Sequence, residues 1–298
     1  MSTATVPDLY PTREAAADAS GSPRLDPVVW PDGPAGPLTG EQLEGYGDKG
    51  YLTAEGLLSP DEVQAYIAEL RLLSNDPGLR GDERVVREPD SDEVRSIFEV
   101  HKISQVLANL AHDRRLVARA RQILGSDVYI HQSRINYKPG YGGNGFYWHS
   151  DFETWHSEDG MPRMRALSVS IALTENLPSN GPLMIMPGSH REFLPCPGRT
   201  PADHYRTSLR EQQVGTPMPD SVKRFADTYG IDQITGPAGS ATFFDSNCMH
   251  GSNGNITPYE RANVFIVYNS VENTLVEPFA APAPRPEHIA SRSFVPVG

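Results

Sequence analysis

Apolar residues recur at helical spacing in two stretches of the N-terminal half of the chain. In the first stretch they fall every three or four residues: Val63, Tyr66, Ile67, Leu70 and Leu73. Ser59, Pro60 and Glu62 match an N-cap, a first helical position and a capping-box partner, so a helix is predicted to begin there. A second helical stretch is predicted over about residues 102–124, with Gly125 placed to end it.

The stretch Val128–Lys138 alternates in the manner of a β-strand. One face carries Val128, Ile130, Gln132, Arg134, Asn136 and Lys138, and the other carries Tyr129, His131, Ser133, Ile135 and Tyr137. The first face is unusual because two apolar residues are followed by four polar ones. Unpaired polar groups are costly to bury, so this face either meets water or lines a polar cavity. His131 falls on the face opposite Gln132 and is expected to be structural.

Further short strands are predicted between turns that are rich in Gly, Pro, Ser and Asn. They cover Leu167–Leu173, Leu183–Met186, Ser240–Phe244 and Ala262–Val271. One more helix is expected over Asp220–Tyr229, and the charged segment of about residues 75–100 is expected to be a loop. Helices followed by many short strands predict a mainly β chain with α-helices. Its core is expected to be a double-stranded β-helix of the jelly-roll, cupin-like kind, with an N-terminal helical layer.

The two ends of this pattern set the domain prediction. Residues 1–45 are rich in Pro, Gly, Ala and Asp and show no sustained periodicity, so they are expected to form an irregular arm. Residues 46–298 are expected to form a single domain, which lies near the upper size that one hydrophobic core organises.

Composition narrows the class of function. The chain has 298 residues, of which 26 are Lys or Arg and 38 are Asp or Glu, giving a formal net charge of −12. Such an acidic surface repels nucleic-acid backbones and anionic lipid. The two cysteines form neither a disulfide framework nor a four-cysteine zinc site, and no apolar run approaches the length of a membrane span. A cytoplasmic protein with a small substrate is expected, binding neither nucleic acid nor membrane.

Residues with side chains that can bind metal or act as acids and bases are most concentrated between Gly145 and His156. His149 and Asp151 are two residues apart, so on a strand both side chains would point the same way. With one distant histidine they would complete the two-histidine, one-carboxylate triad of non-haem Fe(II) oxygenases. His-x-Asp alone is a weak signal, because a chain with nine histidines and 38 acidic residues contains roughly one such pair by chance.

Two downstream residues strengthen the interpretation. His250 follows the predicted Ser240–Phe244 strand, which makes it the candidate third metal ligand. Arg261 comes 11 residues later and adjoins the last predicted strand. A guanidinium group binds a carboxylate through two parallel hydrogen bonds, so Arg261 is the candidate clamp for an acidic co-substrate. Phe265 lies on the same strand face as Arg261 and is expected to look inward as well.

These residues carry a family resemblance. The run HSDFETWHSEDGMPRMRA from His149 to Ala166, followed by Asn180-Gly-Pro-Leu-Met and Pro187-Gly-Ser-His190, resembles the ectoine-hydroxylating branch of the phytanoyl-CoA dioxygenase-like Fe(II)/2-oxoglutarate oxygenases. The resemblance covers roughly residues 50–275. It leaves out the N-terminal arm and the Pro-rich tail after Pro278.

The resemblance assigns roles to three groups of residues. It implies that His149, Asp151 and His250 bind Fe(II). It implies that 2-oxoglutarate is held by Lys138, Arg261, Ser252 and Asn136. It implies that ectoine is bound by Gln132, Trp155, Phe265 and Arg134, and it also places Phe98 at the pocket. The polar face of the Val128–Lys138 strand thereby becomes the wall of a pocket.

The implied reaction is hydroxylation of ectoine to 5-hydroxyectoine with O₂ and 2-oxoglutarate, releasing succinate and CO₂. Two alternatives stay open, namely a hydroxylase of another small cyclic amino acid such as proline, and a non-catalytic metal-binding β-barrel module. A hydrolytic zinc site is disfavoured because no carboxylate is placed to act as a general base. Family resemblance further implies a homodimer.

Overall fold

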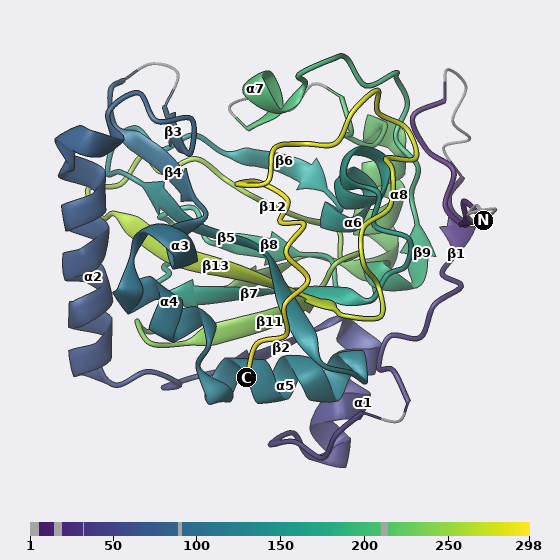
Figure 1. Cartoon of the computed structure of the whole chain (residues 1–298), viewed down its shortest axis with the longest axis horizontal. Coiled ribbons are helices and arrows are strands. Elements are labelled where there is room, and N and C mark those ends of the chain that lie inside the picture. The colour runs from purple at the N-terminus through teal and green to yellow at the C-terminus, as the bar shows by residue number, and fades with distance from the viewer. Residues whose placement is uncertain (1–5, 15–19, 32, 89–90, 210–213) are drawn as a thin grey trace.

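Two antiparallel sheets oppose each other, and a layer of helices covers the outer face of the larger one (Figure 1). The computed structural model describes residues 6–14, 20–31, 33–88, 91–209 and 214–298. The larger sheet contains, in spatial order, β2 (Tyr51–Ala54), β11 (Ala241–Asp245), β7 (Ala166–Ala172), β13 (Arg261–Ser270), β5 (Val128–Lys138), β4 (Val94–Phe98) and β3 (Val85–Arg87). The smaller sheet contains β10 (Asp232–Ile234), β8 (Leu183–Ile185), β12 (His250–Ser252) and β6 (Phe146–His149). This architecture confirms the predicted jelly-roll core with a helical layer.

The helices cluster in the first half of the chain, before the central strands. They are α1 (Gly40–Lys49), α2 (Pro60–Asn75), η1 (Pro77–Leu79), α3 (Val100–Ile103), α4 (Gln105–Ala111) and α5 (Arg114–Leu124). Later helices are α6 (Asp151–Thr154), the π-helix η2 (Trp155–Asp159), η3 (Ser189–Arg191), α7 (Tyr205–Ser208) and α8 (Pro219–Tyr229). A short pair, β1 (Ser22–Pro23) with β9 (Glu192–Phe193), ties the N-terminal arm to the domain. Among the described helices, none combines the length and apolar character that a membrane crossing requires.

Local capping signals set the helix ends where the sequence predicts them. The Ser59 hydroxyl accepts from the Glu62 amide at 3.3 Å, and the Glu62 carboxylate accepts from the Ser59 amide at 2.8 Å, which is a complete capping box. Asp113 caps the start of α5, and Gly125 ends that helix at φ 67°, in the left-handed region. The predicted second helical stretch is therefore confirmed, although it is divided into α3, α4 and α5.

Two predictions of irregular structure are wrong in part. Helix α1 begins at Gly40, inside the arm predicted to be irregular, because Thr39 and Gln42 form a capping box ahead of it. The segment expected to be a loop contains β3 and β4, which pair with each other, and β4 also pairs with β5. Charged residues conceal this part of the sheet in the sequence, since the buried Arg95 of β4 is neutralised by Glu88.

A β-bulge corrects the face assignment along β5. Gln132 pairs with Val267 of β13, but the next register partner is Ile130 with Tyr268, so His131 is the extra residue of the bulge. Val128 and Ile130 consequently join the core under the helices rather than sharing a face with Gln132. The expectation that His131 faces away from Gln132 is wrong. Its ring lies 5.1 Å from that of Trp155, inside the barrel.

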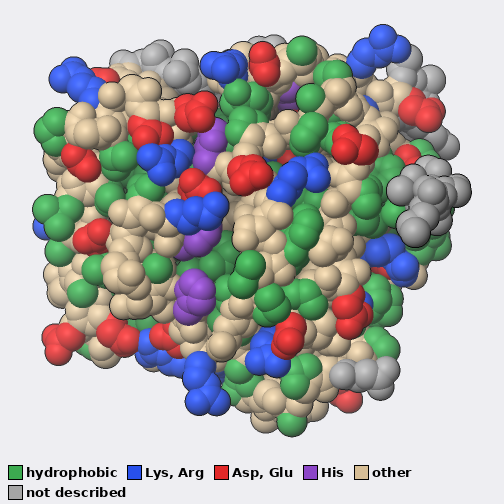
Figure 2. All heavy atoms as spheres, in the orientation of Figure 1, with side chains coloured by type: hydrophobic (Ala, Val, Ile, Leu, Met, Phe, Trp, Pro, Cys, Tyr) green, Lys and Arg blue, Asp and Glu red, His purple; other side chains and the backbone are tan. Residues whose placement is uncertain are grey.

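The surface shows no segregation of charge on the face drawn in Figure 2. Basic and acidic side chains are interspersed there, and no continuous basic patch is visible (Figure 2). Proteins that bind nucleic-acid backbones typically present a clustered positive field, and the expectation that nucleic acid is not a partner stays a prediction.

Candidate metal and substrate site

Three side chains from separate elements converge between the two sheets. His149 ends β6, Asp151 opens α6, and His250 opens β12. The two histidines come together because they are register partners in the antiparallel β6–β12 pair. The strand geometry expected for Asp151 is wrong, since the chain turns into a helix after Ser150. A carboxylate in the first turn of a helix is electrostatically favoured, which is consistent with this start.

The spacing of the three groups suits one metal ion. Nε2 of His149 lies 3.7 Å from Oδ1 of Asp151, and Nε2 of His250 lies 3.9 Å from the same oxygen. These distances are too long for hydrogen bonds, but an ion with bonds of about 2.1 Å spans them. The candidate ligand atoms all lie within 4.8 Å of one another. The predicted triad therefore assembles as a group.

Hydrogen bonds orient each ligand toward that common point. Nδ1 of His149 bonds the carbonyl of Tyr147 at 2.7 Å, and Nδ1 of His250 bonds the carbonyl of Cys248 at 2.9 Å. A carbonyl only accepts, so each Nδ1 carries the proton and each Nε2 keeps its lone pair for a metal. Ser168 donates to Oδ2 of Asp151 at 3.1 Å, which leaves Oδ1 facing the histidines.

The charge states also fit a metal-binding group. Burial, reinforced by the neighbouring His250, lowers the pKa of His149 to about 4, so its imidazole is neutral near pH 7. Burial tends to raise the pKa of Asp151, but the two histidines and Arg134 outweigh it and the net shift is downward. Neutral imidazoles and an ionised carboxylate are the donor forms that Fe(II) takes in a facial triad.

A small cavity with cationic walls lies beside the triad, and we call it the basic cavity. It measures about 30 Å³ and is lined by Arg134, Asn136, Phe146, His149, Leu183, His250, Gly251, Ser252, Arg261 and Phe265. Arg261 donates to Oδ1 of Asn136 at 2.7 Å and to the carbonyl of Gly181 at 2.5 Å, while its buried Nε has no partner among the described residues. Burial first, and then Arg134 and Arg95, lowers the pKa of Arg261 to about 9.

Lys138 lies directly behind this cavity rather than in its lining. Its fully buried amino group donates to the Ser252 hydroxyl at 2.9 Å and to the carbonyl of Asn253. Burial, with added repulsion from Arg261 and Arg95, lowers the pKa of Lys138 to about 6. Lys138 and Arg261 are opposite each other in the β5–β13 register, so the predicted pair of cations is adjacent.

A second cavity also adjoins the triad, and we call it the aromatic cavity. It measures about 60 Å³ and is lined by Ser96, Phe98, Gln132, Arg134, Phe146, His149, Asp151, Thr154, Trp155, Ser208, Leu209 and Arg285. Gln132 donates from Nε2 to the carbonyl of Ile289 at 2.8 Å, which leaves its side-chain carbonyl without that constraint. Trp155 is 3% exposed, and its ring contacts His131.

Arg134 and Phe146 are shared by the linings of the two cavities. The guanidinium of Arg134 lies 5.1 Å from the ring of Phe265 and 5.9 Å from that of Phe98. Arg134 lines both cavities, whereas Phe265, predicted beside the substrate, lines the basic cavity. Phe146 also lines both cavities. Sequence patterning did not single it out, because an aromatic residue before a ligand is usually part of the core.

Arg285 is a further site residue that sequence reasoning missed. It comes from the Pro-rich tail and reaches the aromatic cavity, where Nε and Nη2 bond the two oxygens of Asp159 at 2.7 and 2.5 Å. Burial alone would lower the pKa of Arg285, but Asp159 outweighs it and raises the pKa. In the sequence Arg285 is a single arginine in a segment without periodicity, and that pattern gives no indication of a role in the site.

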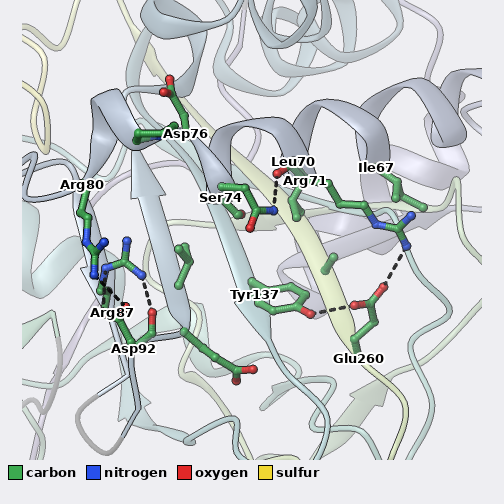
Figure 3. Close-up of a pocket in the computed structure, with 15 residues that line it drawn as sticks. Ile67, Leu70, Arg71, Ser74, Asp76, Arg80, Arg87, Asp92, Tyr137 and Glu260 are labelled. Carbon is green, nitrogen blue, oxygen red and sulfur yellow. Dashed lines mark hydrogen bonds and ion pairs between the residues drawn. The ribbon is translucent and has the colours of Figure 1, made fainter.

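A larger cavity, of about 490 Å³, lies on the opposite side of the same strands (Figure 3). It separates α2 from the outer face of β5 and β13, where Tyr137 donates to Glu260 at 2.7 Å and Arg71 approaches Glu260 at 3.9 Å. Side chains alternate along these strands, so Tyr137 faces this cavity while its neighbours Asn136 and Lys138 face the triad. None of the predicted site residues lines it.

Comparison with known proteins gives one family. The model of the phytanoyl-CoA dioxygenase family matches residues 46–263. An ectoine dioxygenase of Streptomyces coelicolor is 61% identical over 297 residues, covering 99% of this chain and 98% of that protein. Another from Nocardia farcinica is 60% identical over 290 residues, covering 97% of this chain and 95% of that protein.

Solved structures agree with these relatives. The crystal structure of EctD from S. alaskensis with 2-oxoglutarate and 5-hydroxyectoine superposes with a TM-score of 0.86 at 49% identity, covering 96% of this chain and 95% of that chain. The same protein with bound Fe gives a TM-score of 0.86 at 47% identity, covering 98% and 97%. A 2-oxoglutarate-dependent carbocyclase from nogalamycin biosynthesis, at 19% identity and TM-score 0.63, shares the fold.

Proposed function

The chain belongs to the phytanoyl-CoA dioxygenase family, and we propose that it hydroxylates ectoine to 5-hydroxyectoine with Fe(II), 2-oxoglutarate and O₂. The observation that carries the proposal is the convergence of His149, Asp151 and His250 between a basic and an aromatic cavity. Relatives that share half or more of their residues over nearly the whole chain act on ectoine by name. Succinate and CO₂ are the accompanying products.

The triad is proposed to bind the iron. Nε2 of His149, Nε2 of His250 and Oδ1 of Asp151 would hold Fe(II), and a triad of three protein ligands would leave positions for co-substrate and O₂. Bound Fe(II) supplies O₂ activation coupled to the oxidative decarboxylation of 2-oxoglutarate. The protein holds the ligands in place through the backbone carbonyls that accept from each Nδ1 and through Ser168.

The basic cavity is proposed to take the dicarboxylate co-substrate. Arg261 presents a free Nε edge in a buried, cationic environment, and a carboxylate there gains charge-assisted hydrogen bonds. Asn136 fixes the guanidinium of Arg261 in place, and Ser252 and Lys138 extend the polar wall. This division of roles follows the prediction, except that Lys138 acts from behind Ser252.

The aromatic cavity is proposed to take ectoine, a zwitterionic ring with a delocalised cation and a carboxylate. The ring face of Trp155 suits the cation. Arg285, held by Asp159, and the free carbonyl of Gln132 offer a cation and an acceptor that orient the ring. Arg134, between the two cavities, presents positive charge to both ligands. Phe265 is proposed to shape the wall that the two ligands share.

We further place this reaction in the cytoplasm and expect the enzyme to be a homodimer. Cys196 and Cys248 are both buried and unpaired, which suits a reducing compartment. Light scattering coupled to size-exclusion chromatography at micromolar concentration tests the dimer, and a mass of one chain would reject it. Fractionation of the source cells tests the compartment.

A single assay discriminates among the candidate functions. The metal-free protein is loaded with Fe(II) without oxygen, then given O₂ and 2-oxoglutarate with either ectoine or proline. Succinate and hydroxyectoine that form only with ectoine support the proposal. Hydroxylation only of proline would transfer the proposal to the other cyclic amino acid. An absence of succinate with both, in protein that binds the metal, would favour the non-catalytic module.

A further inference from the structure

The helix that carries Asp151 changes its winding just after this residue. Asp151–Thr154 is α-helical, whereas Trp155–Asp159 is a π-helix that ends at Gly160. The Gly160 amide donates to the carbonyl of Trp155, which is the five-residue spacing of a π-turn. A π-turn accommodates one extra residue and is weaker than an α-turn, so it persists only where surrounding contacts hold it.

Arg13 of the N-terminal arm binds Glu153, two residues before this turn in α6, and Glu158, within the turn. Its guanidinium donates to the two oxygens of Glu153 at 2.6 and 2.8 Å, and to Oε1 of Glu158 at 3.1 Å. The three side chains are at most 3% exposed. Glu153 and Glu158 are five residues apart, which is the separation that a π-turn places on one side of a helix. The Arg13 guanidinium therefore links two carboxylates on either side of the point where the winding changes.

The surroundings of Arg13 make the bridge rigid. Thr12 donates to Glu153 at 2.6 Å, and Nδ1 of His204 lies 2.9 Å from Oε1 of Glu158. Arg13 itself adopts φ 62°, a left-handed conformation that costs a non-glycine residue energy. Burial tends to raise the pKa of Glu158, but its hydrogen bond with His204 and nearby arginines outweigh this, so the carboxylate stays ionised.

We propose that Arg13 is a positioning residue that stabilises the π-turn and thereby sets the orientation of Trp155 in the aromatic cavity. The inference rests on the proposed role of Trp155 in binding ectoine. Asp151 is fixed from one side by Ser168, and the far end of the turn is fixed by the pairing of Asp159 with Arg285. Trp155 lies between these anchors, where the winding changes.

The expected displacement is large. If the π-turn converts to α-helical winding, the residues before the turn rotate about the helix axis relative to those after it. The rotation is about 100°, which is the angle between successive residues of an α-helix. Trp155 would then leave the wall that it shares with Gln132 and Thr154. On this proposal the arm, which lies outside the residues matched by the family model, helps to shape the aromatic cavity.

Two variants test the proposal. Arg13→Met removes the bridge, and Glu153→Gln keeps the side-chain volume but removes the negative charge and one of the two oxygens that accept from Arg13. Arg165→Met is the matched control, because Arg165 is 8% exposed against 5% for Arg13 and pairs with Glu272 at 2.5 Å, away from the π-turn. The metal-free proteins are compared by far-UV and near-UV circular dichroism, with Trp155→Phe identifying the tryptophan band.

Arg13→Met is expected to alter the Trp155 band of the metal-free protein while the far-UV spectrum is retained. Its KM for ectoine should rise about tenfold or more, and hydroxyectoine formed per succinate should fall, since misplacement by an ångström costs up to about 100-fold. The KM for 2-oxoglutarate should stay within about threefold, because the basic cavity does not contact Arg13. Glu153→Gln should show the same changes at smaller size, and Arg165→Met only a lower Tm.

An Arg13→Met protein with a lower Tm but an unchanged Trp155 band, ectoine KM and coupling would overturn the proposal, since Arg13 would then be merely structural. If Arg13→Met does not fold, Glu153→Gln decides by the same three readouts. A changed band with normal ectoine kinetics would also overturn the positioning role. The near-UV spectrum needs neither substrate nor metal, so it stays informative even if wild-type protein fails to hydroxylate ectoine.

Discussion

Replacing Arg261 with Met should weaken the use of 2-oxoglutarate selectively. Arg261 is 2% exposed. Its two terminal nitrogens donate to Asn136 and to the Gly181 carbonyl, and its Nε has no partner among the described residues. Met keeps most of the length of the side chain and removes both the charge and the donors. The change therefore tests the clamp while the wall of the cavity stays filled.

The magnitude follows from the kind of contact that is lost. A hydrogen bond to a charged group contributes about 1.5–3 kcal/mol, and each 1.4 kcal/mol corresponds to a tenfold change in affinity. The KM for 2-oxoglutarate should therefore rise about 10- to 100-fold. The lowered pKa of Arg261, to about 9, points the same way, because a cation crowded by Arg134 and Arg95 gains when a dianion arrives.

The assay measures the initial rate of hydroxyectoine formation against 2-oxoglutarate at saturating ectoine and Fe(II). Binding of Co(II) to the metal-free variant, followed by its visible absorption, should be nearly unchanged, because Arg261 contacts none of the triad. Arg71→Met is the control, since Arg71 is exposed on the outer side of the same strands and pairs with Glu260. A KM within about threefold of wild type, in variant protein that binds metal normally, would refute the clamp.

Three other perturbations follow from the same contacts. Trp155→Ala should raise the ectoine KM by about tenfold or more while uncoupled turnover of 2-oxoglutarate continues, and equal losses in succinate and hydroxyectoine would contradict a substrate role. Lys138, with a pKa of about 6, is neutral at pH 8 in the free enzyme and gains a proton when a dianion binds. Calorimetry of 2-oxoglutarate binding in two buffers should therefore show uptake of up to one proton at pH 8 and little at pH 5, and equal uptake at both would exclude Lys138. Gly160→Ala should lower stability by about 2 kcal/mol or more by thermal unfolding, because φ is 79° and a Cβ atom would lie 2.2 Å from the Val276 carbonyl; an unchanged Tm would show that the turn relaxes.

The helical layer and the central strands could be predicted because their signals are local. The capping box at Ser59 and the left-handed Gly125 each depend on residues within one turn, and both appear as expected. The polar face that includes Asn136 and Lys138 was readable for the same reason, since alternation along a regular strand fixes which side chains share a face. Gln132, Arg134 and Asn136 of that face line the two cavities, and Lys138 lies directly behind the basic cavity.

The bulge at His131 could not be predicted from the strand alone. The residue pattern of β5 fits unbroken alternation, and only the register with β13 shows that one residue is inserted between Ile130 and Gln132. A one-residue slip moves every side chain beyond it to the other face of the sheet. His131 was therefore assigned to the wrong face, although Gln132 was assigned correctly.

The contacts of Arg13 and Arg285 could not be predicted from the sequence for a different reason. Both come from irregular segments at the ends of the chain, and their partners Glu153 and Asp159 lie 140 and 126 residues away. No periodicity marks such contacts, because an irregular segment has no repeating face. Glu153 and Asp159 both lie in the run from His149 to Ala166 that carries the family resemblance. Their arginine partners could be identified only from the three-dimensional structure.

The distribution of charge explains why the site lies between the two central strands. Lys138 and Arg261 are opposite each other in the β5–β13 register, Arg134 lies further along the same face of β5 opposite Phe265, and burial lowers the pKa of all three. Burying these basic groups costs free energy because they lose hydration. They stay buried because β5 and β13 are each paired on both sides and cannot separate to admit water. A dianionic co-substrate relieves the repulsion between Arg134 and Arg261 and favours the protonated form of Lys138, so the same burial that destabilises the free site strengthens its preference for 2-oxoglutarate. An exposed arrangement of the same residues would be screened and would lose that preference.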